Sequence, residues 1–152
     1  MSPDDATRAI DFKVLQISSD DIPENGLLPS KFSGDGGNIN PSISVQHIPQ
    51  EARSLVIVML DEKGTVYWLA GNIPVTHFIK QNESHGTMGK NSFGHLHYDG
   101  PKKFTGPAGL IVKVYALKSV LNIHAGAPLA EWEKAMCDDI LAFGSFTFNY
   151  QP

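Results

Sequence analysis

The densest group of chemically distinctive residues lies between Gly86 and Gly109, in the stretch GTMGKNSFGHLHYDGPKKFTGPAG. Closely spaced glycines allow several backbone N–H groups to point at one spot, and such concave nests bind anions such as phosphate or carboxylate. The alternative is that these glycines serve only tight turns. Composition alone does not separate the two interpretations, so the stretch is a candidate anion-binding loop.

His95 and His97 form an H-x-H pair, whose side chains would face the same side of a strand. Two ligands are too few for a closed metal site, and we find no acid or cysteine at a familiar metal spacing. We therefore predict no metal site and place these histidines on the surface or at the rim of a pocket.

Asp61 ends an apolar segment where the chain turns, a position at which a carboxylate either lines a loop-end pocket or serves the turn itself. Cys137 is flanked by Asp138, which does not favour a thiolate, so we expect it to pack. No G-x-S-x-G, phosphate-binding or dinucleotide motif is found. We predict a protein without a cofactor and without enzymatic activity; the alternative is a hydrolase that uses Asp61 and Tyr67.

Short apolar segments separated by Gly, Pro and Asn clusters predict a mainly β fold. Leu55 to Asn72 is expected to form a hairpin that turns at Glu62-Lys63-Gly64. Apolar residues at helical spacing between Pro128 and Gly144 predict one helix at about 128–143. The predicted strands are residues 12–17, 42–46, 54–61, 65–72, 108–117 and 145–150.

The chain has 152 residues, of which 41 % are hydrophobic, enough for one core. We expect residues 1–11 to be a flexible N-terminus and residues 12–152 to form a single domain. The net charge of -4 argues against a nucleic-acid partner. We find neither a signal peptide nor a membrane-length apolar run, and there is one cysteine, so we predict a soluble, cytoplasmic protein without integral membrane association.

Several motifs then occur in a fixed order along the chain. They are FSGDGGNINPSISV (32–45), a strand ending at residue 61, YWLAGNIP (67–74), GKNSFGHLHYDGP (89–101) and KVYALKSVL (113–121). This ordered set resembles the phosphatidylethanolamine-binding protein family, and most closely its prokaryotic Raf-kinase-inhibitor-like branch. The resemblance covers nearly the whole chain from Phe12 onward.

The resemblance implies an antiparallel Greek-key β-sandwich with peripheral helices. It also implies a small pocket that accepts an anionic group, such as phosphate, a phospholipid head group or a carboxylate. Members of the family often inhibit or modulate kinases or proteases, so the resemblance also implies a protein target.

The resemblance also assigns pocket residues, because Asp61 matches the acidic residue at the pocket edge and Trp68 matches the usual tryptophan. Two departures affect anion binding: Tyr67 and Ala108 stand where the family has histidines. Lysines are candidates to replace the lost charge, namely Lys90, Lys102 and Lys103. The predicted ligand-binding residues are Asp61, Tyr67, Trp68, Gly89, Lys90, Asn91, Phe93, Gly94, Tyr98, Gly100, Pro101 and Ala108.

The leading hypothesis is a regulatory protein that binds a small anionic ligand in a divergent pocket. A charge-assisted hydrogen bond contributes about 1.5 to 3 kcal/mol, so the loss of two imidazoles predicts weaker phosphate binding. Two alternatives are kept: the hydrolase named above, and an interaction scaffold, most simply a homodimer, in which the pocket has decayed.

Overall fold

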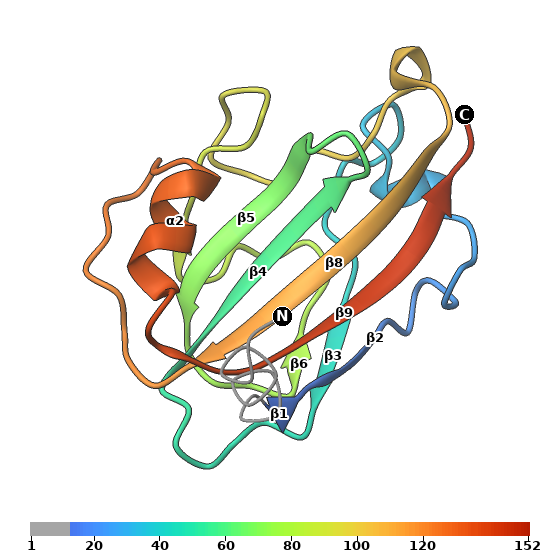
Figure 1. The fold of residues 1–152 in the computed structure, drawn as a ribbon. Coiled ribbons are helices and arrows are strands. Elements are labelled where there is room, and N and C mark those ends of the chain that lie inside the picture. The colour runs from blue at the N-terminus through green and yellow to red at the C-terminus, as the bar shows by residue number, and fades with distance from the viewer. Residues whose placement is uncertain (1–12) are drawn as a thin grey trace, which may run out of the picture.

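Two β-sheets and one α-helix form the described part of the chain, residues 13–152 of a computed structural model. The larger sheet has the strand order β1-β9-β8-β4-β5-β7, and the smaller has the order β2-β3-β6 (Figure 1). The strands are β1 (Lys13–Val14), β2 (Gln16–Ser18), β3 (Ile43–Gln46), β4 (Ser54–Asp61), β5 (Val66–Ile73), β6 (Phe78–Ile79), β7 (Thr87–Met88), β8 (Ala108–Leu117) and β9 (Ile140–Tyr150). The helices are α2 (Leu129–Met136) and the short 3₁₀ turns η1 (Ser30–Phe32) and η2 (Lys103–Thr105). The predicted mainly β fold is confirmed.

The larger sheet carries a hydrophobic core on each face. One core lies between the two sheets and includes Phe146 and Phe148, which alternate with exposed residues along β9. The other lies between the larger sheet and α2 and is centred on Trp132. Strand β4 contributes to both cores, which explains why its sequence is apolar on both faces and confirms its central position.

The predicted hairpin is confirmed, since β4 pairs with β5 in antiparallel register. Gly64 has φ 87° at its turn, a conformation that favours glycine. Asp61 also shapes the turn, because its Oδ1 accepts the backbone N–H groups of Lys63 at 2.9 Å and Thr65 at 3.0 Å.

The helix prediction is wrong at its C-terminal end, since α2 stops at Met136 and residues 140–143 belong to β9. The chain is redirected at Asp139, whose carbonyl accepts the N–H of Lys118 at 2.9 Å and whose carboxylate accepts the hydroxyl of Ser119. These contacts attach it to the end of β8, with which β9 then pairs. Gly144 therefore lies inside a strand and does not end the helix.

The strand expected at residues 12–17 is divided into β1 and β2, and its first residue lies outside the described chain. β1 pairs with β9 in parallel, in contrast to the antiparallel pairing predicted throughout. β6 and β7 have two residues each, too few to produce a recognisable alternation. The Greek-key connection and the single domain stay predictions, and the flexible N-terminus at residues 1–11 lies outside the described residues.

Within residues 13–152, no helix is both long enough and apolar enough to span a membrane. Residue 12 and those before it are not covered by this finding.

A substitution at Trp132 tests the packing of the core between the larger sheet and α2. Its side chain is fully buried, and its indole N–H donates to the carbonyl of Ala127 at 3.0 Å. We predict that Trp132→Ala lowers the free energy of unfolding by about 3 to 5 kcal/mol, because it leaves a large cavity. Urea denaturation measures the loss, and Glu133→Ala, on the exposed side of α2, is the control. Equal unfolding midpoints for the two variants would contradict this packing.

Candidate functional site

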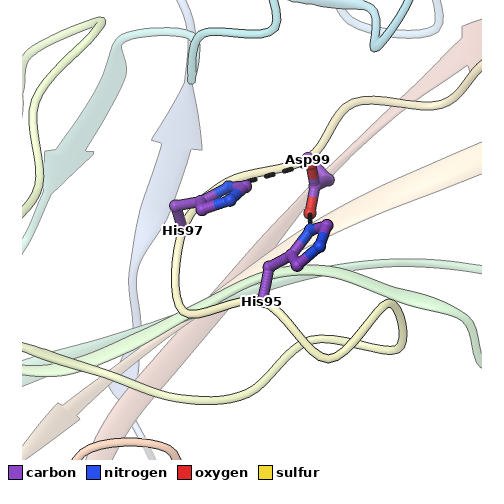
Figure 2. Close-up of side chains that lie close together, drawn as sticks. All are labelled: His95, His97 and Asp99. Carbon is purple, nitrogen blue, oxygen red and sulfur yellow. Dashed lines mark hydrogen bonds and ion pairs between the residues drawn. The ribbon is translucent and has the colours of Figure 1, made fainter.

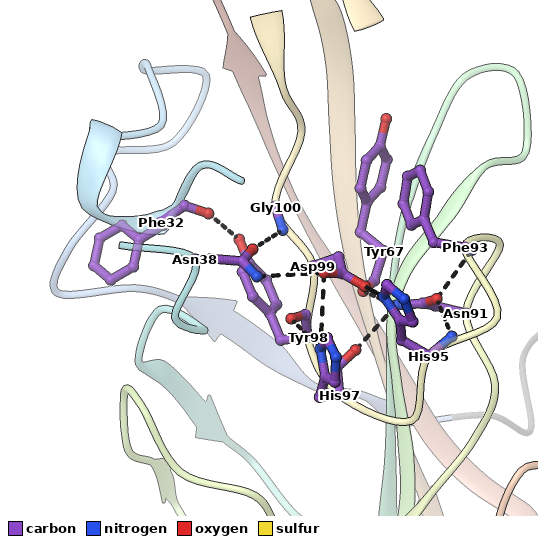
Figure 3. A network of polar contacts seen from close by, with 10 residues as sticks. All are labelled: Phe32, Asn38, Tyr67, Asn91, Phe93, His95, His97, Tyr98, Asp99 and Gly100. Atoms are coloured by element: carbon purple, nitrogen blue, oxygen red, sulfur yellow. Dashed lines mark hydrogen bonds and ion pairs between the residues drawn. The ribbon is translucent and has the colours of Figure 1, made fainter. Parts of the chain in front are cut away.

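The pocket loop, residues 89–101, follows β7 and lies beside the turn between β4 and β5 (Figure 3). Asn91 fixes its shape. The Asn91 amide donates to Asp99 Oδ2 at 2.8 Å and to the carbonyl of His97 at 2.9 Å. Its Oδ1 accepts the backbone N–H groups of Phe93 and His95, each at 3.0 Å. Asn91 is 5 % exposed, so its hydrogen bonds hold the loop and leave little of the side chain for a ligand.

The loop also places two imidazoles beside one carboxylate (Figure 2). His95 Nδ1 lies 2.7 Å from Asp99 Oδ2, and His97 Nδ1 lies 3.7 Å from Asp99 Oδ1. The two rings are stacked, with centroids 4.7 Å apart. The expected same-side arrangement of the H-x-H pair is therefore present, although residues 95–97 are not in a strand.

Asp99 belongs to this cluster but is not among the site residues predicted from the sequence. Its position two residues after His97 continues the spacing of the H-x-H pair, and that spacing was the available signal. Burial of Asp99 tends to raise the pKa of its carboxyl group, but hydrogen bonds from Asn91, His95 and Asn38 outweigh it and lower the pKa. The carboxylate therefore stays ionised beside the imidazoles.

The end of the pocket loop is tied to a second loop, which follows η1. Tyr98 donates its hydroxyl to the carbonyl of Phe32 at 2.7 Å, and Gly100 donates its N–H to Asn38 Oδ1 at 2.7 Å. A Cβ at Gly100 would lie 2.1 Å from the oxygen of Phe32, so only glycine fits there. Tyr98 is buried, with its ring against Trp68. Tyr98, Gly100 and Trp68 thus connect and support the two loops.

Asp61 and Tyr67 do meet at the loop end, as the family resemblance implies. Tyr67 donates its hydroxyl to Asp61 Oδ2 at 2.9 Å, and its ring packs against Phe93, with the centroids 5.8 Å apart. Burial raises the pKa of the Tyr67 phenol above its usual range, and the bond to Asp61 raises it further. Both oxygens of Asp61 have donors from the chain, since Oδ1 accepts the two turn amides.

Other predicted site residues lie apart from this pair. A Cβ at Gly89 would lie 2.7 Å from the indole nitrogen of Trp132, so this glycine allows close packing with α2. The next residue, Lys90, is exposed and donates its N–H to Ala127. Gly94 has φ 80° at the tip of the pocket loop. Pro101 is buried and accepts the N–H of Gly34.

Ala108 begins β8, directly opposite Tyr150 of β9. Tyr150 lies on the wall of a cavity of about 410 Å³ at this end of the molecule. Of the three candidate lysines, Lys103 lines that cavity, whereas the Lys102 ammonium lies 5.9 Å from the centroid of the Phe104 ring. The lining residues are Leu28, Ser30, Ser33, Asp35, Gly36, Lys103, Tyr150, Gln151 and Pro152.

A second hollow of about 280 Å³ has Asp61 and Glu62 on its wall. Glu62 Oε2 accepts the N–H of Gly109 at 2.9 Å, so this carboxylate is held close to the start of β8. An anion in this hollow would face two carboxylates. Its electrostatics are therefore opposite to those of an anion site.

The comparisons with known proteins all indicate the same family. A family model described as phosphatidylethanolamine-binding protein matches residues 18–151. A UPF0098 protein of Pyrococcus abyssi is 34 % identical over an alignment of 140 positions, and the match covers 82 % of this chain and 79 % of that protein. The UPF0098 protein YbcL of Escherichia coli is 29 % identical over an alignment of 127 positions, and the match covers 69 % of this chain and 69 % of that protein.

Two solved structures share the fold. CT736 of Chlamydia trachomatis, described as a homologue of phosphatidylethanolamine-binding protein, has a TM-score of 0.86 at 23 % identity, covering 92 % of this chain and 99 % of that one. YbcL of Escherichia coli, described as a member of the mammalian PEBP family, has a TM-score of 0.81 at 21 % identity, covering 91 % and 98 %.

The hydrogen bonds of Asn91 predict that replacing this residue with alanine destabilises the protein. Asn91→Ala removes donors from Asp99 and acceptors from Phe93 and His95, and each buried polar group left unpaired costs about 1 to 3 kcal/mol. We expect the free energy of unfolding in urea to fall by about 3 kcal/mol. Asn122→Ala, at an exposed loop position, is the matched control and should change it by less than about 0.5 kcal/mol. A loss no larger than the control's would show that Asn91 does not hold the loop.

The tyrosines predict the behaviour of the protein at alkaline pH. The pKa values of all four phenols are raised, first of all by burial. Because each phenol binds its proton more tightly in the folded protein than in the unfolded chain, protonated tyrosines add to the free energy of unfolding. This contribution is complete below the unfolded-state pKa of about 10 and is lost as the pH rises above it. Absorbance at 295 nm should show little phenolate at about pH 10 in the native protein and half-ionisation there in urea. A native-state midpoint near 10, with unchanged circular dichroism, would contradict this.

Proposed function

The chain belongs to the phosphatidylethanolamine-binding protein family, and from this premise we propose that it is a regulatory protein that binds a small anionic ligand at an altered pocket. The anionic group is a phosphate, a phospholipid head group or a carboxylate. Its charge partner is Lys103, and its place is the 410 Å³ cavity beside Tyr150. That cavity is the observation on which the proposal depends.

The hydrolase alternative has little support from the geometry of its two residues. A general base needs a lone pair directed at a substrate proton, but hydrogen bonds from the chain already fill three of the roughly four acceptor positions of the Asp61 carboxylate. Tyr67 is fully buried and has a raised pKa, so it is a poor source of phenolate. A structural role at the end of the β4–β5 hairpin therefore fits this pair better than a catalytic one.

The family position for the anion is also unfavourable here. Tyr67 offers no positive charge, and its hydroxyl already donates to Asp61. Glu62 adds a second carboxylate near the start of β8. At about 4 Å, each carboxylate would repel an anion by roughly 1 kcal/mol in water and roughly 4 kcal/mol at an effective dielectric constant of 20.

The cavity beside Tyr150 has better chemistry for an anion. Ala108 is the β8 residue that pairs with Tyr150, although Ala108 does not itself line the cavity. Lys103 supplies charge, and Ser30 and Tyr150 supply hydroxyl groups. Asp35 opposes the anion, although its Oδ2 accepts the N–H of Lys103 at 2.5 Å. The mixed charge supports modest affinity, and the volume lies within the range usual for small-molecule sites.

A thermal-shift experiment with inorganic phosphate, phosphoethanolamine, acetate and citrate tests this proposal. A ligand that binds the native state stabilises it by RT ln(1 + [L]/Kd), so a concentration-dependent rise in Tm is expected at millimolar ligand. Lys103→Ala should abolish the rise, while Lys118→Ala, at an exposed lysine of the loop after β8, should leave it unchanged. No rise with any of the four anions, or a rise that is equal in both variants, would refute the proposal.

Restoring the family residues provides a second arm. Tyr67→His with Ala108→His introduces two imidazoles, each able to add a charge-assisted hydrogen bond of about 1.5 to 3 kcal/mol. We expect phosphate to bind the double variant more tightly, through a site that no longer depends on Lys103. If the double variant instead binds no better than the natural chain, the substitutions at 67 and 108 are not what altered the pocket.

A further inference from the structure

The cluster of His95, His97 and Asp99 has the chemistry of a metal site. One nitrogen or oxygen atom from each residue lies within 4.8 Å of the others. We propose that these three residues bind a divalent transition-metal ion such as zinc. This site goes beyond the anion cavity, shares no residue with it, and stands or fails independently of it.

The donor set points to the class of metal. Two imidazoles and one carboxylate suit zinc, cobalt, nickel and copper, whereas magnesium and calcium require a larger set of oxygen ligands. Three protein ligands with one open position is also the arrangement of exposed zinc sites that keep a water molecule. A fourth protein ligand is not needed for such a site.

The distances lie near those that a metal requires. Tetrahedral coordination with bonds of about 2.1 Å places neighbouring donor atoms about 3.4 Å apart. His95 Nδ1 lies 2.7 Å from Asp99 Oδ2 and His97 Nδ1 lies 3.7 Å from Asp99 Oδ1, and one donor atom from each of the three residues lies within 4.8 Å of the others. His95 Nδ1 therefore has to move away from Asp99 by several tenths of an ångström, so that the ion lies between the two groups and replaces their direct contact.

The histidines are free enough to make this adjustment. Their side chains are 51 % and 58 % exposed, so an ion can enter from solvent and keep a water molecule at its open position. One contact has to be given up, because His97 Nδ1 also lies 3.0 Å from the carbonyl of Tyr98. A metal–nitrogen bond compensates for the loss of that hydrogen bond.

The carboxylate, in contrast, is held in place before any ion arrives. Asp99 is only 9 % exposed at its side chain, and it accepts hydrogen bonds from Asn91 at 2.8 Å and from Asn38 at 3.3 Å (Figure 3). Its backbone N–H donates to the carbonyl of Tyr67 at 3.0 Å. Such outer contacts orient metal ligands, and their loss commonly weakens metal binding 10- to 100-fold.

Titration with Co²⁺ and Zn²⁺ in buffer without phosphate tests the site. The visible absorption of bound Co²⁺ reports coordination by nitrogen and oxygen, and Zn²⁺ should displace Co²⁺ with a stoichiometry of one ion per chain. The double variant His95→Ala/His97→Ala, which changes only exposed side chains, should bind at least about 100-fold more weakly, and Asn38→Ala about 10-fold more weakly. His124→Ala, at an exposed histidine that lies 4.0 Å from Glu131, is the control and should match the natural chain.

Histidine ring ¹⁵N NMR gives a second measurement, which does not depend on the stability of any variant. The Zn²⁺-induced shifts should be largest at His95 and His97 and absent at His124. The proposal is overturned if Zn²⁺ does not bind saturably at 100 µM, if the double variant binds as tightly as the natural chain, or if the shifts appear at other histidines. Binding that survives in Lys103→Ala would separate this site from the anion cavity.

Discussion

The carboxylate of Asp61 is buried at the end of the β4–β5 hairpin and must be hydrogen-bonded, and the chain supplies every donor itself. Two turn amides satisfy one oxygen and the hydroxyl of Tyr67 satisfies the other. A buried charge without such partners would cost several kcal/mol, so this arrangement stabilises the hairpin. The same hydrogen bonds engage the carboxylate of Asp61. Tyr67, which stands where the family has a histidine, therefore both stabilises this end of the molecule and changes what the position can bind.

A second carboxylate, Asp99, is held in a different way. Its hydrogen bonds come from Asn91 and Asn38 on two loops, and they leave it facing the half-exposed rings of His95 and His97. The Asp61 carboxylate is therefore engaged by donors of its own hairpin, whereas Asp99 contacts two histidine rings that remain accessible to solvent. In the pocket loop, the buried side chains of Asn91 and Asp99 hold the conformation, and the exposed side chains of His95 and His97 are accessible to a ligand.

The sequence predicts the long elements well, and tertiary contacts explain where it does not. The strands at 54–61 and 108–117 match exactly, because their apolar runs are bounded by turn residues. The end of α2 is mispredicted because Ile140 continues the helical spacing, while in the structure it pairs with Leu117. The contacts of Asp139 with the loop after β8 and the pairing of β9 with β8 favour the strand, and sequence periodicity does not contain such long-range contacts.

The sequence predicts which residues belong to the site better than it predicts what each residue does there. The motif identifies Asn91, Tyr98 and Gly100, but their roles depend on partners far away in sequence, such as Phe32, 66 positions from Tyr98, and Asn38, 62 positions from Gly100. Such pairings cannot be read from local spacing. Asp99 is the exception, since its spacing from His95 and His97 was visible in the sequence.

In the proposed function, an anion avoids the Asp61–Tyr67 position and occupies the cavity beside Tyr150. The most direct measurement is a titration of the ¹⁵N-labelled protein with inorganic phosphate, followed by two-dimensional ¹H–¹⁵N NMR. We predict saturable shifts at the amides of Ser30, Gly36 and Lys103, with those of Lys63, Thr65 and Gly109 unchanged. Shifts centred on Lys63, Thr65 and Gly109, with none at Lys103, would contradict it.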